Sequence, residues 1–337
     1  MTKASIQAVA AEAGVSVSTV SRTFAKPDLV LPETRTRVMA AAQKLDFQVS
    51  RSAAALKSGQ SFRIALLHSD RISTWFNANV YEGLNSVFHP AGYDLSLYGM
   101  PNAQTRHEFF TDMPVRRNVD AVIVCSFDID PDEVGRLKNI NVPIVGINIP
   151  STDGFDASVS IDNKQAMHMA VEHLVSLGHR RIAFVYGAPD DSSQLRFSAD
   201  ERLRGLLDAC AAHPDVQAEQ IRFTGHDDPT NMVIAQLTTM SPAPTAVCFQ
   251  TDEVALPVLY RLPQYGRRIP QDLSLIGFDD IPFCAKIGLT TLRQNPYDLG
   301  ASAARKTLDL MSHKPLDQQF EAIRPQLILR DTTAIAT

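Results

Sequence analysis

The spacing of apolar residues along the chain changes near residue 60. Up to residue 48, apolar positions recur every three or four residues, which predicts short helices. A compact run over residues 8–13 stops at Gly14, and glycine suits a helix C-terminus because it adopts a positive φ without strain. A second helix is expected over 17–24, capped by Ser16, and a third over about 32–45. This order predicts a helix-turn-helix unit.

The next stretch, residues 49–61, is rich in Ala and Ser and has only weak helical character. An isolated helix of this length is marginal in water. We therefore expect a linker that folds on contact with a partner.

From residue 63 onward, apolar runs of strand length alternate with amphipathic runs of helix length. The strand-like runs cover residues 64–67, 121–124, 143–147, 182–185, 246–249 and 273–276, and the helix-like runs include 166–177 and 201–211. Such alternation predicts parallel sheets covered by helices on both faces. About 270 residues of it suggest two doubly wound lobes, with ligands bound at the C-terminal ends of the strands.

Charge divides the chain at the same place. The whole chain has 45% hydrophobic and 20% charged residues and a net charge of −5. Residues 1–60 hold eight basic against four acidic side chains, a net charge of +4, which leaves −9 on the other 277 residues. A basic head on an acidic body suggests that the head alone meets nucleic-acid phosphate.

Several classes of protein are disfavoured by what the sequence lacks. The four cysteines show no C-x-x-C pair, so we expect free buried thiols and neither a zinc site nor a disulfide framework. No glycine-rich phosphate loop occurs, and no cofactor or metal is expected. No apolar run resembles a signal peptide or a membrane span, so a cytoplasmic protein without membrane contact is expected.

Residues 9–22 contain the pattern A-G-V-S-x-x-T-V-S-R, which closely resembles the N-terminal signature of the lactose-repressor family (LacI/GalR-type regulators). Residues 33–38, 53–56, 173–183 and 277–280 resemble later segments of the same family. The resemblance implies an α/β chain: a three-helix head and a two-lobed, periplasmic-binding-protein-like body of doubly wound parallel sheets with three crossovers. It also implies a homodimer that binds palindromic operator DNA as a repressor under the control of a small molecule.

On this basis we expect a head over 1–48, a hinge over 49–61 and an effector-binding and dimerisation body over 62–337. Lobe 1 is expected at about 62–160 and 283–313, and lobe 2 at about 161–282 and 314–330. The C-terminal residues hold no leucine heptad, which favours a dimer over a tetramer.

The resemblance implies roles for residues of the second helix and the hinge. Arg22 and Ser18 can bond base edges in the major groove, and Val17 can contact a thymine methyl group. Ser16, Thr19 and Ser21 suit phosphate contacts, although Thr19 and Ser21 could be merely solvated. In the hinge, the resemblance implies DNA contacts for Arg51 and Leu56, with Leu56 as a wedge in the minor groove.

The predicted effector site is drawn from strand ends and the loops that follow them. Its candidates are Trp75, Phe76, Asn148, Asp162, Arg196, Arg202 and Asp279. An aromatic face with planar Asp, Asn and Arg groups is typical of sugar recognition, so the expected effector is a carbohydrate. A nucleoside or another metabolite is the alternative. The two aromatic residues could instead pack in the core or between lobes, and the two aspartates could cap helices.

Two other functions were weighed against a DNA-binding regulator. A transport binding protein would share the body, but the basic head counts against it. An enzyme, such as a glycosidase, would need paired acids, and the adjacent pairs at 190–191, 227–228 and 279–280 point to opposite faces of an extended chain. We therefore expect no enzyme and no catalytic residues.

Overall fold

The computed structural model describes residues 4–25, 27–47, 60–116, 118–138, 141–187, 196–224 and 228–337. It divides into two compact units, residues 1–61 and 62–337. This division falls at the predicted boundary between hinge and body. In the described part of the chain, no helix is long and apolar enough to cross a membrane.

The first unit is a three-helix head. Its elements are α1 (Ile6–Ala13), α2 (Val17–Ala25), the short 3-10 helix η1 (Pro27–Leu29) and α3 (Pro32–Lys44). Ser5 caps α1 by accepting a hydrogen bond from the Ala8 N–H group, and Gly14 ends it with φ 63°. Val9, Val20 and Val38 are fully buried and join the three helices. The predicted helices are therefore confirmed.

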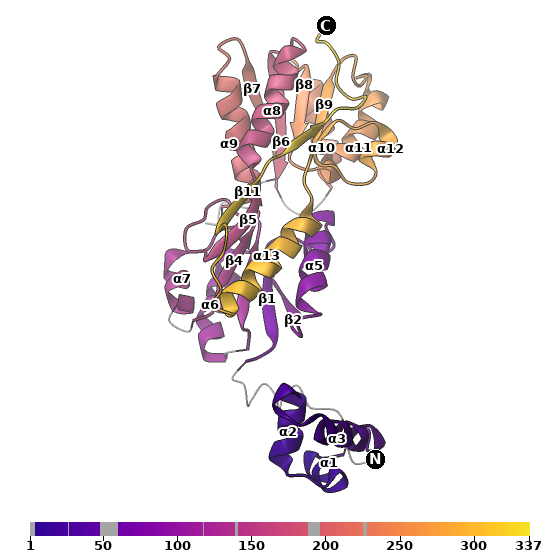
Figure 1. The fold of residues 1–337 in the computed structure, drawn as a ribbon. Helices are drawn as coiled ribbons and strands as arrows, with labels where there is room; N and C mark the ends of the chain where they lie inside the picture. The colour runs from indigo at the N-terminus through magenta and orange to yellow at the C-terminus, as the bar shows by residue number, and fades with distance from the viewer. Residues whose placement is uncertain are drawn as a thin grey trace. The chain divides into compact units, whose positions relative to one another are not determined.

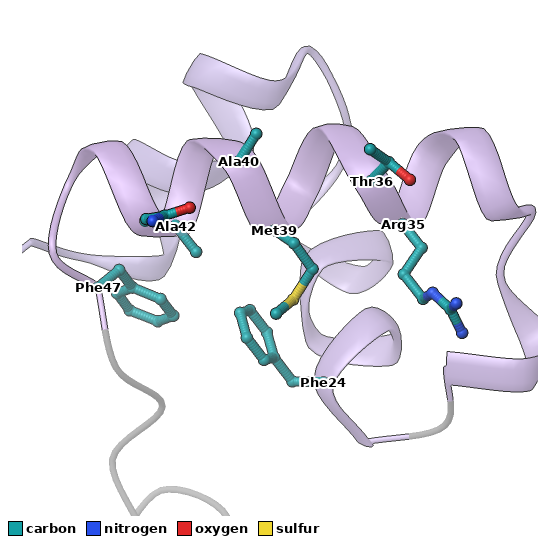
Figure 2. A pocket seen from close by; sticks show the side chains of 8 residues that line it. Phe24, Arg35, Thr36, Met39, Ala40, Ala42 and Phe47 are labelled. Carbon is teal, nitrogen blue, oxygen red and sulfur yellow. The ribbon is translucent and has the colours of Figure 1, made fainter.

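The head carries a shallow apolar pocket on the outer side of α3 (Figure 2). The rings of Phe24 and Phe47 lie 6.0 Å apart and line this pocket, and the end of the Met39 side chain lies beside Phe24 (Figure 2). These contacts fasten the residues after α3 to the end of α2.

The second unit holds two parallel sheets, each covered by helices on both faces (Figure 1). The first sheet has the order β11-β5-β4-β3-β1-β2. Its strands are β1 (Arg63–His68), β2 (Asp94–Gly99), β3 (Ala121–Cys125), β4 (Ile144–Ile147), β5 (Ala157–Ile161) and β11 (Phe320–Ile323). Helices α5 (Trp75–Phe88) and α13 (Pro296–Met311) cover one face, and α6 (Ala103–Arg116) and α7 (Pro131–Lys138) cover the other (Figure 1).

The second sheet has the order β12-β10-β9-β8-β6-β7, with β12 alone antiparallel to its neighbour. Its strands are β6 (Arg181–Gly187), β7 (Gln217–Phe223), β8 (Ala246–Phe249), β9 (Ser274–Asp279), β10 (Thr291–Arg293) and β12 (Gln326–Ile328). Helices α8 (Asn163–Ser176) and α9 (Ser198–Ala211) pack on one face. The other face carries α10 (Thr230–Thr239), α11 (Asp252–Arg261), the 3-10 helix η2 (Leu262–Tyr265) and α12 (Cys284–Ile287).

The chain crosses between the lobes three times: after β5, after β10 and after β11. The predicted α/β fold class is confirmed. The predicted lobe boundaries are wrong in two places, because β10 pairs with β9 of lobe 2 and β11 pairs with β5 of lobe 1. Lobe 1 therefore takes the segment from after β10 to β11. Both strands are short and lie at or next to the edge of a sheet. The sheet that each one joins is decided by its strand partners more than by its own apolar pattern.

All four cysteines are buried and free, as predicted. Burial raises the pKa of Cys125 to about 12 and that of Cys210 to about 11. Such thiols stay protonated and unreactive at neutral pH.

Candidate DNA interface and interlobe site

The N-terminal end of α2 presents three hydroxyl groups at one point of the head. Ser16 Oγ lies 2.7 Å from Ser18 Oγ and 2.9 Å from Thr19 Oγ1, and it accepts a hydrogen bond from the Thr19 N–H group at 3.2 Å. A helix N-terminus is the positive end of its dipole, so these groups suit an anion such as phosphate.

The candidate DNA residues lie on the outer side of α2, and its inner side is core. Ser18 and Arg22 are exposed, and 41% of the surface of Val17 is exposed. Ser21 is half-buried. Val20, on the inner side of α2, is fully buried. The hinge candidates Arg51 and Leu56 lie outside the described residues.

Arg202 is the centre of a buried polar cluster between the lobes. Only 4% of its surface is exposed, and Cζ lies 3.6 Å above the ring centroid of Phe278. Its Nη1 donates a hydrogen bond to the carbonyl of Gln250, and its Nε donates to Asn163 Oδ1 at 2.9 Å. Burial lowers the pKa of Arg202 to about 10, which leaves the guanidinium charged at neutral pH.

Asn148, directly after β4 of lobe 1, joins this cluster through Asn163. The Nδ2 group of Asn163 donates to Asn148 Oδ1 at 2.9 Å. Asn148 is 1% exposed and has φ 51°, in the left-handed region. Its own Nδ2 is buried and has no hydrogen-bond partner among the described residues.

Asp279 is the last residue of β9 in lobe 2, and its backbone has φ 128°. Its Oδ1 accepts a hydrogen bond from Gln294 Nε2, while the buried Gln294 Oε1 has no partner in the described chain. Burial raises the pKa of Asp279 well above its ordinary value, and the charge of Arg202 opposes that rise. The neighbouring Asp280 pairs instead with Arg293 and Arg330, at 2.6 Å each. The two adjacent carboxylates thus have different partners.

Asn163, Gln294 and Asp252 complete the cluster and were not among the predicted effector residues. Asp252 is fully buried at the start of α11, where it accepts hydrogen bonds from Thr291 Oγ1 at 2.7 Å and from the Ile281 N–H group at 3.1 Å. A Cβ at Gly277 would lie 2.0 Å from Asp252 Oδ1, so this carboxylate needs glycine on β9. For Asp252 the sequence holds one hint, the acidic residues in Thr-Asp-Glu at 251–253. The same pattern is equally typical of the start of a helix.

Four of the predicted effector residues have other partners. Trp75, from α5 of lobe 1, packs against the core of lobe 2, and its backbone N–H group donates to Glu253 Oε1 at 3.1 Å. Phe76 packs against the core of lobe 1. Asp162 is exposed and caps α8 by accepting from the Gln165 N–H group at 2.9 Å. For these three residues the structure adopts the packing and capping alternatives.

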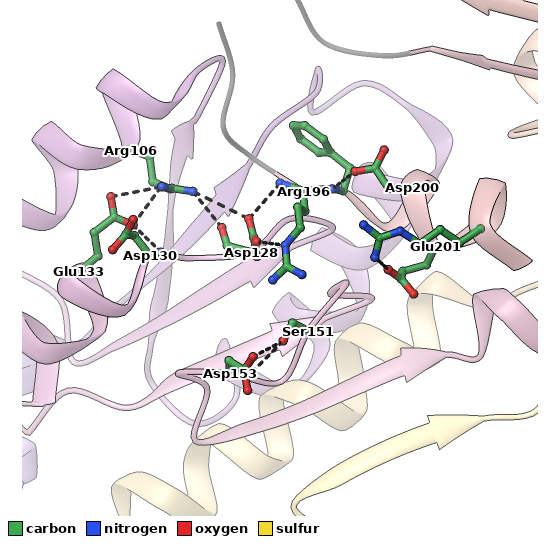
Figure 3. A network of polar contacts seen from close by, with 11 residues as sticks. Arg106, Asp128, Asp130, Glu133, Ser151, Asp153, Arg196, Asp200 and Glu201 are labelled. Carbon is green, nitrogen blue, oxygen red and sulfur yellow. Dashed lines mark hydrogen bonds and ion pairs between the residues drawn. The ribbon is translucent and has the colours of Figure 1, made fainter. Parts of the chain in front are cut away.

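Arg196, the fourth, lies in an interlobe network (Figure 3). Its Nε donates to Asp128 Oδ2 at 2.7 Å, and its backbone N–H group donates to Asp128 Oδ1 at 3.0 Å. Arg106 bonds the Asp128 carbonyl at 3.2 Å and pairs with buried Glu133 at 2.9 Å. An antiparallel bridge between Phe127 and Phe197 runs beside these contacts. Backbone hydrogen bonds and an ion pair thus join the two lobes at this point.

Among the described residues, no group of three or more His, Cys, Asp or Glu side chains could hold a metal ion. What the interlobe cluster offers is a set of oriented donors and acceptors around one buried cation. Such a set can bind a polar molecule.

Comparisons with known proteins match both parts of the chain. Residues 5–50 match the model of bacterial regulatory proteins of the lacI family, and residues 171–333 match the periplasmic binding protein-like domain. The chain belongs to the lacI family of regulators. It is therefore a DNA-binding transcriptional regulator with a ligand-binding type of body.

This regulator is similar over nearly its whole length to catabolite control protein A of Priestia megaterium, with 28% identity over 328 residues, 96% of this chain and 98% of that protein. Its fold matches the lac repressor dimer bound to operator and the anti-inducer ONPF, with a TM-score of 0.83 at 24% identity, over 99% of this chain and 100% of that one. A lacI-family regulator from Enterococcus faecium with bound ribose matches at a TM-score of 0.69 and 25% identity, over 82% of this chain and 100% of that one.

Proposed function

We propose that this regulator is a repressor whose affinity for operator DNA is set by a carbohydrate held between its two lobes. The observation that carries the proposal is the buried cluster around Arg202. It draws Asn148 from lobe 1 and Asp279 from lobe 2, and among the described residues the Asn148 Nδ2 donor has no partner. A buried unpaired donor costs about 1–3 kcal/mol, which a ligand acceptor would recover.

A carbohydrate fits this cluster because each hydroxyl group both donates and accepts. Asn148 offers a donor, and Gln294 Oε1 offers an acceptor. A neutral ligand brings no further charge into this buried cluster, and burying an uncompensated charge would be costly. A nucleoside, which carries a ribose ring, is the second candidate.

In the head, Val17, Ser18 and Arg22 would read base edges, and the hydroxyl groups of Ser16, Thr19 and Ser21 would contact phosphates. A homodimer would place two heads on a palindromic operator in the cytoplasm. Arg51 and Leu56 of the hinge would then contact DNA between the half-sites.

The test uses the full-length protein and an operator found by selection from random DNA. Thermal shift with D-ribose, other neutral sugars and inosine identifies a ligand that raises the unfolding midpoint. Gel shift then measures operator affinity with and without it. Asp279→Ala should bind operator like the ligand-free parent and fail to respond to the ligand.

A folded Asp279→Ala protein that responds with the parent's midpoint and amplitude would remove Asp279 from the site. Circular dichroism establishes that the variant is folded. A chain whose operator binding no sugar or nucleoside changes would reject the effector class proposed here.

A further inference from the structure

Asn163 occupies the first crossover between the lobes. It is the first residue of α8, directly after β5 and the capping residue Asp162. Its side chain is 5% exposed and contacts residues of both lobes: Asn148 after β4 and Arg202 of α9. It was not among the residues predicted to bind the effector.

The hydrogen-bond directions in this cluster follow from one residue. A guanidinium group has only donors, so the Asn163 atom that faces Arg202 must be the acceptor Oδ1. The Nδ2 of Asn163 then faces Asn148, whose Oδ1 must accept. The remaining group of Asn148 is therefore the donor Nδ2, the buried atom without a partner in the described chain. These assignments come from the network, as amide orientations generally do.

Arg202 itself is held in place by groups that do not depend on Asn163. The ring of Phe278 lies against its guanidinium, and the carbonyl of Gln250 accepts from its Nη1. The orientation of both amides is thus fixed before a ligand arrives, which lowers the ordering cost of binding.

We propose that Asn163 is a positioning residue of the effector site: it transmits the donor polarity of Arg202 to Asn148 and so presents Asn148 Nδ2 as a donor that the effector must meet with an acceptor oxygen. The inference rests on the proposed effector site. It adds a requirement on the ligand, because a group that can only donate, such as an ammonium, cannot satisfy this atom.

The variant that reverses the polarity is Asn163→Asp. A carboxylate accepts at both oxygens, so it would still accept from Arg202 but would also accept from Asn148. Asn148 would turn its Oδ1 to the site instead of its Nδ2. The matched control is Asn231→Asp, the same change at an exposed residue of α10 in the same lobe.

The first measurement needs no ligand. Full-length protein with asparagine-selective ¹⁵N labelling gives side-chain amide signals, and the signal lost in Asn148→Ala belongs to Asn148. In Asn163→Asp this signal should move to lower field, because the amide now donates to a carboxylate. The control Asn231→Asp should leave it in place. An unmoved Asn148 signal in a folded Asn163→Asp protein overturns the proposal that Asn163 orients the Asn148 amide.

The second measurement is calorimetric titration of the same full-length proteins with D-ribose and with inosine. For whichever probe binds the parent, Asn163→Asp should weaken binding about tenfold or more, as loss of one hydrogen bond to a buried group does. Asn231→Asp should bind like the parent. Asn148→Ala added to Asn163→Asp should cost little more, because both changes act through one atom.

Fold-losses that multiply in the double variant would overturn the inference, since Asn163 would then act by another route. Asn163→Ala provides a second single variant, should the aspartate not fold. A parent protein that binds neither probe would exclude D-ribose and inosine as effectors, and the amide signal would still decide whether Asn163 orients Asn148.

Discussion

The two candidate sites of this regulator are built in opposite ways. The DNA face lies within seven consecutive residues at one end of α2, and most of its side chains are exposed. The interlobe cluster takes one residue from each of six separate segments, and all six are buried: Asn148, Asn163, Arg202, Asp252, Asp279 and Gln294.

Because of this difference, substitutions at the two sites should affect different properties: DNA binding in the head and protein stability in the cluster. An exposed side chain of the head can change without disturbing the core beneath it, so its loss should be visible only with DNA present. A buried charge or amide in the cluster has partners that become unsatisfied when it is removed, so its loss should be visible in the protein alone. Three arginines in three settings allow the same substitution to test the contrast.

The largest effect is expected for Arg202→Ala. It removes the donors to Asn163 Oδ1 and to the Gln250 carbonyl, and each buried acceptor left unsatisfied costs about 1–3 kcal/mol. Urea unfolding followed by the fluorescence of Trp75, the sole tryptophan, reports on the body. A stability within about 1 kcal/mol of the parent would show that the cluster is solvated in solution.

Arg22→Ala should leave stability unchanged and weaken specific DNA binding by about 1–3 kcal/mol, the value of one bidentate base contact. Gel shifts on the selected operator and on random DNA measure the two affinities. The preference at one base pair per half-site should relax. Equal losses on both DNAs would make Arg22 a phosphate contact instead.

A smaller effect is expected for Arg196→Ala. Its side chain is 48% exposed, so solvent screens its ion pair with Asp128, and its backbone hydrogen bonds to Asp128 remain after the change. Such pairs contribute about 0–1 kcal/mol. Calorimetry with the identified effector tests whether Arg196 also binds the effector. A tenfold loss of effector affinity in Arg196→Ala would show that it does.

The smallest effect is a pH dependence that only the body shows. Burial lowers the pKa of His173 and of His179, whereas residues 1–60 contain no histidine. Below their ordinary pKa near 6.5 the unfolded chain binds more protons than the folded one, so this stability is present above that pH and is lost as pH falls.

The measurement compares urea midpoints at pH 7.5 and 5.5 by Trp75 fluorescence, for the parent and for His179→Gln. The variant should lose less stability on acidification. The comparison with the variant is needed because the raised pKa of Asp279 contributes with the opposite sign. An identical loss in both proteins would exclude His179 as a source of the slope.

Much of the fold was readable from local pattern. The three helices of the head follow from apolar spacing, from the glycine at position 14 and from the serine cap at position 16. The six apolar runs became β1, β3, β4, β6, β8 and β9, because central parallel strands are buried on both faces and read as continuous apolar segments. The family signature likewise lies in one uninterrupted stretch, so the sequence alone was enough to name candidate DNA contacts residue by residue, and these stay predictions.

The remaining strands and the composition of the cluster were decided by tertiary structure. β10 and β11 have three and four residues, and β11 is largely exposed, so neither carries an apolar pattern that names its sheet. Asn163 and Gln294 are ordinary polar residues in sequence. Their importance arises because the crossovers bring them against Arg202 and Asp279, where water is excluded and each donor or acceptor needs a partner. A sequence specifies which groups the chain has, but only the packed lobes decide which of them are left facing one another.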